Sequence, residues 1–367
     1  MNKIKVGFST SCVSKDEIIA LLSKRFNVEV LDKNYDYFFC MEGIYNSKDN
    51  FLELISQKPE VIRIFYCGEA VYCDLNLFDY AVCFDEFNKD RILKFPHKLF
   101  YSWLDDETSI DKIKSNIDAK DILKEKTKFC NFIYSNALAH PMRDKLFYAL
   151  SKYKKVDALG THLKNVEIKN TRYDSNWEKM SVELKKPYKF SIAAENAQFK
   201  GYTSEKIITS MLANTIPIYF GDPDVAKLFN SKSFINVSDY ACLEDVVKRV
   251  KEIDTNDDLY LEMISQPWRS KEQAENCEKE YQEHLQKFYH IFEQDFEKAH
   301  RRPQGCWPDF IYSAFFQSLF NDKFLNNRDS FLQYILSIDM GGGGRKILNS
   351  LRKYFLLRTT PINNIKT

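Results

Sequence analysis

The stretch Tyr188–Pro223, YKFSIAAENAQFKGYTSEKIITSMLANTIPIYFGDP, constrains the fold more than any other part of the chain. The apolar run Phe190–Ala194 predicts a buried strand, and Ile216–Phe220 predicts a second one. Between them, a polar loop is followed by apolar residues at helical spacing: Ile207, Ile208, Met211 and Leu212. The stretch therefore predicts one strand–loop–helix–strand unit, which is typical of α/β folds.

The start of the predicted helix is the first candidate for a binding site. Thr203 and Ser204 supply a hydroxyl cap, and Lys206 lies in the first turn. Helix N-termini favour anions, because several backbone N–H groups and the positive end of the helix dipole converge there. Since an acidic residue is electrostatically preferred at this place, Lys206 indicates that a negative group is bound nearby.

Length and composition limit the class of protein. A chain of 367 residues suits two domains, and its hydrophobic content of 44% supports packed cores. The net charge of +1 argues against a general nucleic-acid binder. The 9 cysteines contain no CxxC pair, which favours free thiols in a reducing compartment. Without a signal core or an apolar run of ~20 residues, we expect a cytoplasmic protein.

The rest of the chain alternates strands with helices. In the first part, strands are predicted at Lys3–Phe8, Val28–Val30, Tyr37–Cys40, Val61–Tyr66 and Phe78–Phe84, with helices at Asp16–Arg25 and Asn50–Gln57. A second such pattern begins at Phe129–Tyr134 with the helix Arg143–Tyr153. We therefore expect an α/β protein with two Rossmann-like domains that face a central cleft, residues 1–125 and 126–300.

The end of the chain has a different character. Gly341–Gly344 precede RKILNSLRKYFLLR, residues 345–358, which place apolar side chains on one helical face and basic ones mostly on the other. A basic amphipathic helix on a flexible tether fits adsorption to an anionic membrane surface. A helix that packs against the body or a partner is the alternative. The tail, residues 341–367, is thus expected to hold the protein peripherally at the inner membrane.

Arg143 and Lys206 are the leading candidates for a diphosphate site. Each lies at the predicted start of a helix that follows a strand, where anions bind. Arginine can grip a phosphate bidentately and lysine acts as a compact charge, whereas an isolated surface cation is the plain alternative. Glu205 suits sugar hydroxyls or merely the helix dipole. Asn196 and Tyr202 suit contacts to a nucleotide, although turns also use asparagine freely.

Glu69 is the candidate general base. It follows the apolar strand Val61–Tyr66, and α/β sheets place their ligands beyond the carboxyl ends of parallel strands. An ordinary loop acid is the alternative. Asp222-Pro223-Asp224 imitates a metal-binding Asp-x-Asp, but its place at a proline turn favours a structural role. No His/Cys cluster has metal-ligand spacing, and neither a G-x-G-x-x-G nor a Walker-type loop is present.

Three motifs in correct order resemble the α-1,3/4-fucosyltransferases of glycosyltransferase family 10, especially the bacterial enzymes that build Lewis antigens. The first is FYCGE at residues 65–69 with FDYAVCFDEF, and the second is FCNFIYSN with Arg143 downstream. The third is the stretch Tyr188–Pro223, similar to the donor-site signature of that family. The resemblance runs from about Val61 to about Val237.

The resemblance implies a GT-B fold, with the acceptor domain first and late helices, residues 301–340, crossing back to it. It implies inverting transfer of fucose from GDP-fucose to N-acetylglucosamine of a LacNAc-type acceptor in lipopolysaccharide, with neither a cofactor nor an obligatory metal. Glu69 matches the base, Arg143 and Lys206 the diphosphate contacts, and Glu205 a sugar contact. Asn196 and Tyr202 match other donor contacts. An α-1,4 linkage, another nucleotide sugar and a non-catalytic glycan-binding protein are the alternatives.

Overall fold

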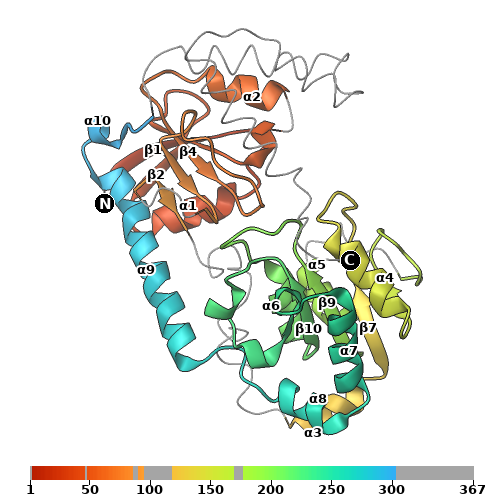
Figure 1. The fold of residues 1–367 in the computed structure, drawn as a ribbon. Helices are drawn as coiled ribbons and strands as arrows, with labels where there is room; N and C mark the ends of the chain where they lie inside the picture. The colour runs from red at the N-terminus through yellow and green to blue at the C-terminus, as the bar shows by residue number, and fades with distance from the viewer. Residues whose placement is uncertain (1, 46–47, 86–89, 95–117, 169–176, 303–367) are drawn as a thin grey trace. The chain divides into compact units, whose positions relative to one another are not determined.

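The computed structural model describes residues 2–45, 48–85, 90–94, 118–168 and 177–302 (Figure 1). The chain forms two compact units. Among the described residues, unit 1 comprises those up to Cys67, the segment Cys73–Ala81 and residues 291–302, and unit 2 comprises those of Gly68–Tyr72 and Val82–His290. The predicted domain boundary at residue 125, the helices at 301–340 and the tail at 341–367 stay predictions, since residues 95–117 and 303–367 lie outside the described ranges.

The first sheet, most of which lies in unit 1, has fully buried strands at its centre and more exposed ones at its β2 edge. Its order is β2-β1-β3-β4-β5-β6, and β1 pairs in parallel with β2 and β3, as β3 does with β4. The strands are β1 (Lys3–Phe8), β2 (Asn27–Val30), β3 (Tyr37–Cys40), β4 (Ile62–Tyr66), β5 (Tyr80–Val82) and β6 (Ile92–Leu93). The helical elements beside them are α1 (Lys15–Ser23), η1 (Glu42–Tyr45) and α2 (Lys48–Ile55). Both β3 and β4 are buried at every residue, as expected of parallel strands covered on both faces.

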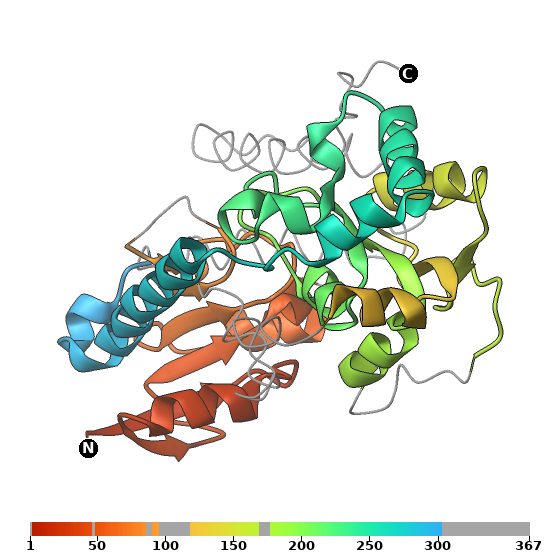
Figure 2. The same cartoon turned by 90° about the horizontal axis from the view of Figure 1, so that it is seen from below.

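The long helix α9 (Lys271–Glu293) returns the chain to unit 1, followed by α10 (Phe296–Ala299) (Figure 2). The ring of Phe292 packs on Tyr37 of β3, with ring centroids 4.6 Å apart. The buried carboxylate of Asp79 then pairs with the guanidinium of Arg302 and accepts a bond from its backbone N–H. The chain therefore packs back on the first sheet through the end of α9, α10 and Arg302, whereas the helices predicted at 301–340 lie almost wholly outside the described residues.

The sheet of unit 2 is parallel throughout, with the order β11-β10-β9-β7-β8. Its strands are β7 (Lys128–Phe132), β8 (Val156–Ala158), β9 (Tyr188–Ala194), β10 (Ile216–Phe220) and β11 (Ile235–Asn236). The helices are α3 (Ala119–Glu125), α4 (Met142–Ser151), α5 (Trp177–Lys185), α6 (Glu205–Leu212), α7 (Leu243–Asp254) and α8 (Asp257–Ile264), with short 3-10 turns η3 (Val225–Lys227), η4 (Ser231–Ser233) and η5 (Val237–Asp239).

Helices cover both faces of this sheet, because successive side chains of a strand point to opposite sides. Phe190 and Ile192 of β9 join the core cluster that includes α4, α7 and α8, whereas Ala193 joins the cluster that includes α6. The strand order reverses between β7 and β9, and ligands of such sheets bind beyond the carboxyl ends of the strands at that point. The predicted α/β class with parallel sheets is confirmed.

Two helices of unit 2 are additions to the sequence-based prediction. The helix α3 lies in the segment predicted to be a connection, and α5 was not predicted at all. The described cysteines form no disulfide, and most of their thiols are buried. Within the part of the chain that the structure describes, no helix combines the length and apolar character needed to cross a membrane.

Candidate active site in unit 2

A cavity of about 340 Å³ opens beside the carboxyl ends of β7 and β9, where the strand order of unit 2 reverses. Its charged lining residues are Glu69, Arg143, Lys185, Glu205 and Lys206. Asn196 also lines it, and Tyr202 contacts Glu69. The structure therefore brings together all six residues that the sequence singled out for chemistry.

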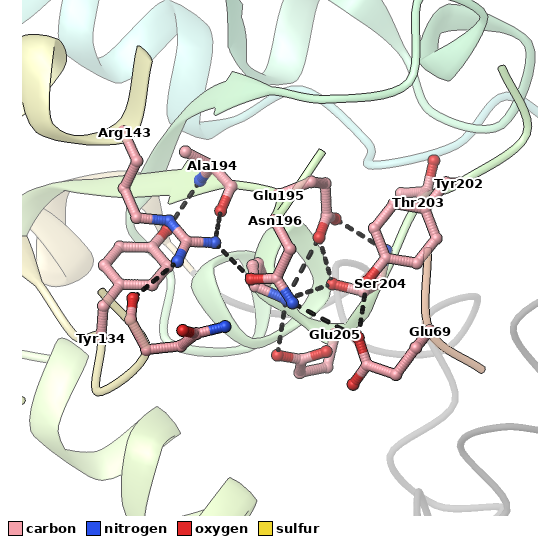
Figure 3. Close-up of polar contacts among 12 residues, drawn as sticks. Glu69, Tyr134, Arg143, Ala194, Glu195, Asn196, Tyr202, Thr203, Ser204 and Glu205 are labelled. Carbon is pink, nitrogen blue, oxygen red and sulfur yellow. Dashed lines mark hydrogen bonds and ion pairs between the residues drawn. The ribbon is translucent and has the colours of Figure 1, made fainter. Parts of the chain in front are cut away.

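Arg143 is fixed in the wall of this cavity by neutral partners. It lies in the first turn of α4 and is only 1% exposed. Its guanidinium stacks on the ring of Tyr134, 4.0 Å from the ring centroid, and donates to the carbonyl of Ala194 at 2.9 Å (Figure 3). Its Nε is buried and has no partner among the described residues. Arg143 is thus not a solvated surface cation, and its charge is not cancelled by any of these partners.

Asn196 links this arginine to the candidate base. Its Oδ1 accepts a bond from Arg143 at 2.7 Å, and its Nδ2 donates to Glu69 Oε2 at 3.3 Å (Figure 3). The hydroxyl of Tyr202 donates to the same oxygen of Glu69, also at 3.3 Å. The carboxylate of Glu69 is exposed, so an incoming hydroxyl group can reach it.

The segment that carries Glu69 is held by aromatic side chains of unit 2. The ring of Tyr72 lies 5.0 Å from that of Phe199 and 5.5 Å from that of Phe84, between centroids. Phe84 in turn meets Tyr202 edge-on, at 5.4 Å. These contacts explain why Gly68–Tyr72 leaves the end of β4 and groups with unit 2, the unit that contains Lys206.

Lys206 is part of an ionic cluster at the start of α6, in which Glu195 is fully buried and Lys206 and Glu205 are partly exposed. Its ammonium lies 3.1 Å from the carboxylates of both Glu195 and Glu205. Burial opposes the charged ammonium, but the two carboxylates outweigh it and raise the pKa of Lys206. Burial raises the pKa of Glu195, against the pull of Lys206. The negative group that the position of Lys206 implied is therefore supplied, at least in part, by the chain itself.

Ser204 is the N-cap residue of α6, but the prediction that its hydroxyl caps the helix is wrong. The hydroxyl makes no capping bond and instead donates to Glu195 at 2.5 Å, while the backbone N–H of Ser204 donates to the same carboxylate at 2.7 Å. Glu195 is fully buried and needs these donors more than the helix end does. The close approach of Glu195 also requires glycine at position 221, since a Cβ there would lie 2.4 Å from Glu195 Cγ.

Asp222 has protein partners that fit a structural role. Its buried carboxylate accepts bonds from the backbone N–H of Gly201 at 2.9 Å and from the hydroxyl of Thr203 at 3.0 Å. Gly201 has a positive φ of 82°, which favours glycine, so Asp222 anchors a tight turn ahead of α6. Among the described residues, no group of three or more His, Cys, Asp or Glu side chains could hold a metal ion. The expected independence from metals stays a prediction.

Sequence reasoning missed two charged residues of this region. Glu195 was read as part of a polar loop, although its place directly after a buried strand was a usable signal. Lys185 was missed because α5 was missed, although Trp177, Met180 and Leu184 follow the spacing of a helical face. Both residues are buried, and Lys185 lines the cavity.

Two family models match separate parts of the chain. The model described as glycosyltransferase family 10 (fucosyltransferase) C-term matches residues 123–302. The model of the α-(1,3)-fucosyltransferase FucT N-terminal domain matches residues 6–101. Both models therefore point to the same family, and they occur in the order expected for one protein of that family.

Individual proteins give the same result. The chain is 35% identical over 276 residues to the α-(1,3)-fucosyltransferase FucT of Helicobacter pylori, covering 66% of this chain and 54% of that protein. It is 33% identical over 226 residues to a fucosyltransferase-like protein of Acanthamoeba polyphaga mimivirus, covering 60% of this chain and 36% of the relative. The chain thus spans about half, or less, of the length of these curated relatives. A crystal structure of an α1,3-fucosyltransferase with GDP superposes with a TM-score of 0.61 at 27% identity, covering 82% of this chain and 93% of that one.

Proposed function

The chain belongs to glycosyltransferase family 10, and we propose that it transfers L-fucose from GDP-fucose to a hydroxyl group of an N-acetylglucosamine-containing glycan. The observation that carries the proposal is the meeting of Arg143, Lys206 and Glu69 around one cavity at the strand-order reversal of unit 2. Cations there suit a diphosphate, and a carboxylate exposed beside them suits proton transfer.

The donor is proposed to be held by its diphosphate. Arg143 and Lys206 lie at helix starts on the cavity wall, and a related solved structure contains GDP. Glu205 is proposed to accept hydrogen bonds from hydroxyls of the fucose ring, while Asn196 and Tyr202 contact other parts of the donor. The pairing of Lys206 with two carboxylates fixes the position of its ammonium before the donor arrives.

The reaction is proposed to invert the anomeric carbon in a single displacement. The acceptor oxygen forms a bond to that carbon as the bond to the diphosphate breaks, and the hydroxyl proton passes to Glu69. Preorganised cations facing the charge on the departing diphosphate typically supply ~3–4 kcal/mol for each donor group. A positioned base adds roughly 10²–10⁴-fold in rate.

The acceptor is proposed to be a LacNAc-type or related unit of a lipopolysaccharide O-antigen, fucosylated through an α-1,3 linkage as in Lewis antigens. The named activity of the Helicobacter pylori relative supports α-1,3 over α-1,4. We place the reaction in the cytoplasm at the inner membrane, with the tail 341–367 on its anionic surface. That tail lies outside the described residues.

A donor screen followed by an acceptor assay tests this function. Among nucleotide sugars, GDP-fucose is expected to give the largest rise in thermal midpoint, because a ligand that binds only the folded state stabilises it. Transfer to an acceptor array with linkage analysis should then yield fucose on position 3 of N-acetylglucosamine. Stabilisation by a different nucleotide sugar would overturn the donor, and binding of GDP-fucose without transfer to any glycan would favour a binding protein.

A further inference from the structure

Lys185 is a buried lysine that the proposed reaction does not yet use. It ends α5, is 5% exposed and lines the same cavity as Arg143 and Lys206. Its Nζ donates to the hydroxyls of Thr209 at 2.6 Å and Ser210 at 3.4 Å, both on α6. No carboxylate forms an ion pair with it among the residues that the structure describes. A buried lysine without a counter-ion is unusual enough to need an explanation.

The hydrogen bonds around Lys185 fit the neutral amine, which has two N–H groups to donate. The hydroxyl of Thr209 donates a hydrogen bond to the carbonyl of Glu205 at 2.8 Å, and the hydroxyl of Ser210 donates one to the carbonyl of Lys206 at 2.7 Å. Both hydroxyls are therefore acceptors toward Lys185. A neutral amine is satisfied by these two bonds, whereas an ammonium has a third N–H that finds no acceptor in the described part of the chain.

The charges that face Lys185 come from three directions. Glu205 and Lys206 lie on α6, Glu195 follows β9, and Arg143 of α4 lines the same cavity. Together with Glu69 there are three carboxylates. They are matched by two cations, Arg143 and Lys206, if Lys185 is neutral, and by three cations if Lys185 is charged. A ligand with two negative charges therefore favours the charged form of Lys185.

We propose that Lys185 is a further donor-binding residue, which takes up a proton when the diphosphate of the nucleotide sugar enters the cavity and offers its third N–H to a phosphate oxygen. The proposal rests on the proposed function. Burial, which outweighs the nearby carboxylates, lowers the pKa of Lys185 from 10.5 to about 7 in the absence of a ligand. The amine is then close to half protonated at neutral pH, so a small electrostatic change is enough to charge it.

Calorimetric titration of the full chain with GDP-fucose, in two buffers of different ionisation enthalpy, measures the uptake directly. Both phosphates of this ligand are esterified, so the ligand has no phosphate that titrates near pH 7. Wild type is expected to take up about half a proton at pH 7, and its affinity should fall up to about tenfold per pH unit above that. Lys185→Met should bind with no proton uptake and a nearly flat pH dependence.

The control is the neighbouring Lys186→Met, since Lys186 is exposed and pairs with Glu183 at 2.6 Å. It should retain the full uptake. If Lys185→Met does not fold, Lys185→Gln keeps N–H donors for the two hydroxyls and serves the same test. Uptake that persists without Lys185 would assign the proton to Glu195 and overturn the proposal, as would wild-type binding without uptake. No binding of GDP-fucose to wild type would overturn the proposed function and this proposal with it.

Discussion

The two sheets share a strand order, but the side chains at their corresponding edges differ. In unit 1 the order reverses between β1 and β3, and in unit 2 it reverses between β7 and β9. At the unit 1 reversal, Glu53 of α2 accepts bonds from the hydroxyls of Ser9 at 3.2 Å and Thr10 at 3.1 Å. At the unit 2 reversal, the guanidinium of Arg143 and the side chains of Lys185 and Lys206 line a cavity.

The difference teaches that topology fixes where a ligand binds, while the side chains fix what it is. Hydroxyls and a carboxylate are the groups that recognise sugar hydroxyls, and cations recognise diphosphate. We therefore expect unit 1 to bind the acceptor and unit 2 to bind the donor. Three substitutions test this division, and a fourth tests a contribution to stability within unit 1.

The largest effect is expected from Glu69→Gln. Glu69 follows a strand of unit 1, but its side chain lies in the site of unit 2. Turnover should fall by roughly 10²–10⁴-fold, since glutamine cannot accept the proton of the acceptor hydroxyl. The affinity for GDP-fucose, measured by titration, should change little. If the variant retains turnover, Glu69 is not the general base.

Lys206→Met should have the second largest effect and should act on the donor side. Loss of one preorganised cation lowers turnover by roughly 10²–10³-fold and weakens binding of GDP-fucose. The variant also leaves the buried Glu195 without its cation, so its thermal midpoint should fall. The exposed Lys200→Met, in the same unit, is the matched control. Unchanged donor kinetics in Lys206→Met would contradict the diphosphate assignment.

Glu53→Gln tests the unit 1 edge and should act on the acceptor alone. Loss of a charged hydrogen-bond acceptor worth about 1.5 kcal/mol raises the KM for the acceptor roughly tenfold. The affinity for GDP-fucose should stay within about twofold of wild type. Asp49→Asn, an exposed change on the same helix, is the control. An effect on the donor instead would break the proposed division between the two edges.

Glu17→Gln should have the smallest effect, on stability and not on transfer. Burial raises the pKa of Glu17 to about 7, although the hydroxyl of Tyr66 donates to it and lowers it. Between about pH 4.5 and 7 only the folded state holds this proton, so stability falls as the pH rises and the full loss is present above pH 7. Because Glu17 is partly exposed, we expect only about 1 kcal/mol.

Urea unfolding at pH 5, 6 and 8 measures this slope. The Glu17→Gln variant should lose the contribution, and Asp16→Asn, which changes an exposed neighbour, should retain it. An unchanged slope in Glu17→Gln would assign the pH dependence of stability to other groups.

The sequence predicted most strands because parallel strands buried on both faces appear as continuous apolar runs, as Ile216–Phe220 does. It also predicted which residues meet at the cavity, because Glu69 and Asn196 follow such strands directly. These features depend on local pattern, which a sequence displays without further information.

The hydrogen-bond and packing partners of each side chain could not be predicted, because they depend on contacts between elements that are distant in the sequence. Ser204 has a hydroxyl that suits a helix cap, but this hydroxyl instead donates a hydrogen bond to the buried carboxylate of Glu195. Arg143 has the pattern of a surface residue, yet it stacks on Tyr134 in the interior. The short helix α5 carries polar residues among its apolar ones, so its helical spacing is weak and the burial of Lys185 at its end was missed with it.

The amide of Asn196 has one consequence for the whole site. Its oxygen faces Arg143 and its nitrogen faces Glu69. In the flipped orientation, the amide NH2 would face the N–H donors of Arg143, and the amide oxygen would face the carboxylate of Glu69. The side chain thus acts as an oriented spacer between a cation and a carboxylate that would otherwise attract each other. In the absence of substrate, this spacing keeps the two opposite charges from neutralising each other by direct contact, which leaves each one available to a different reactant.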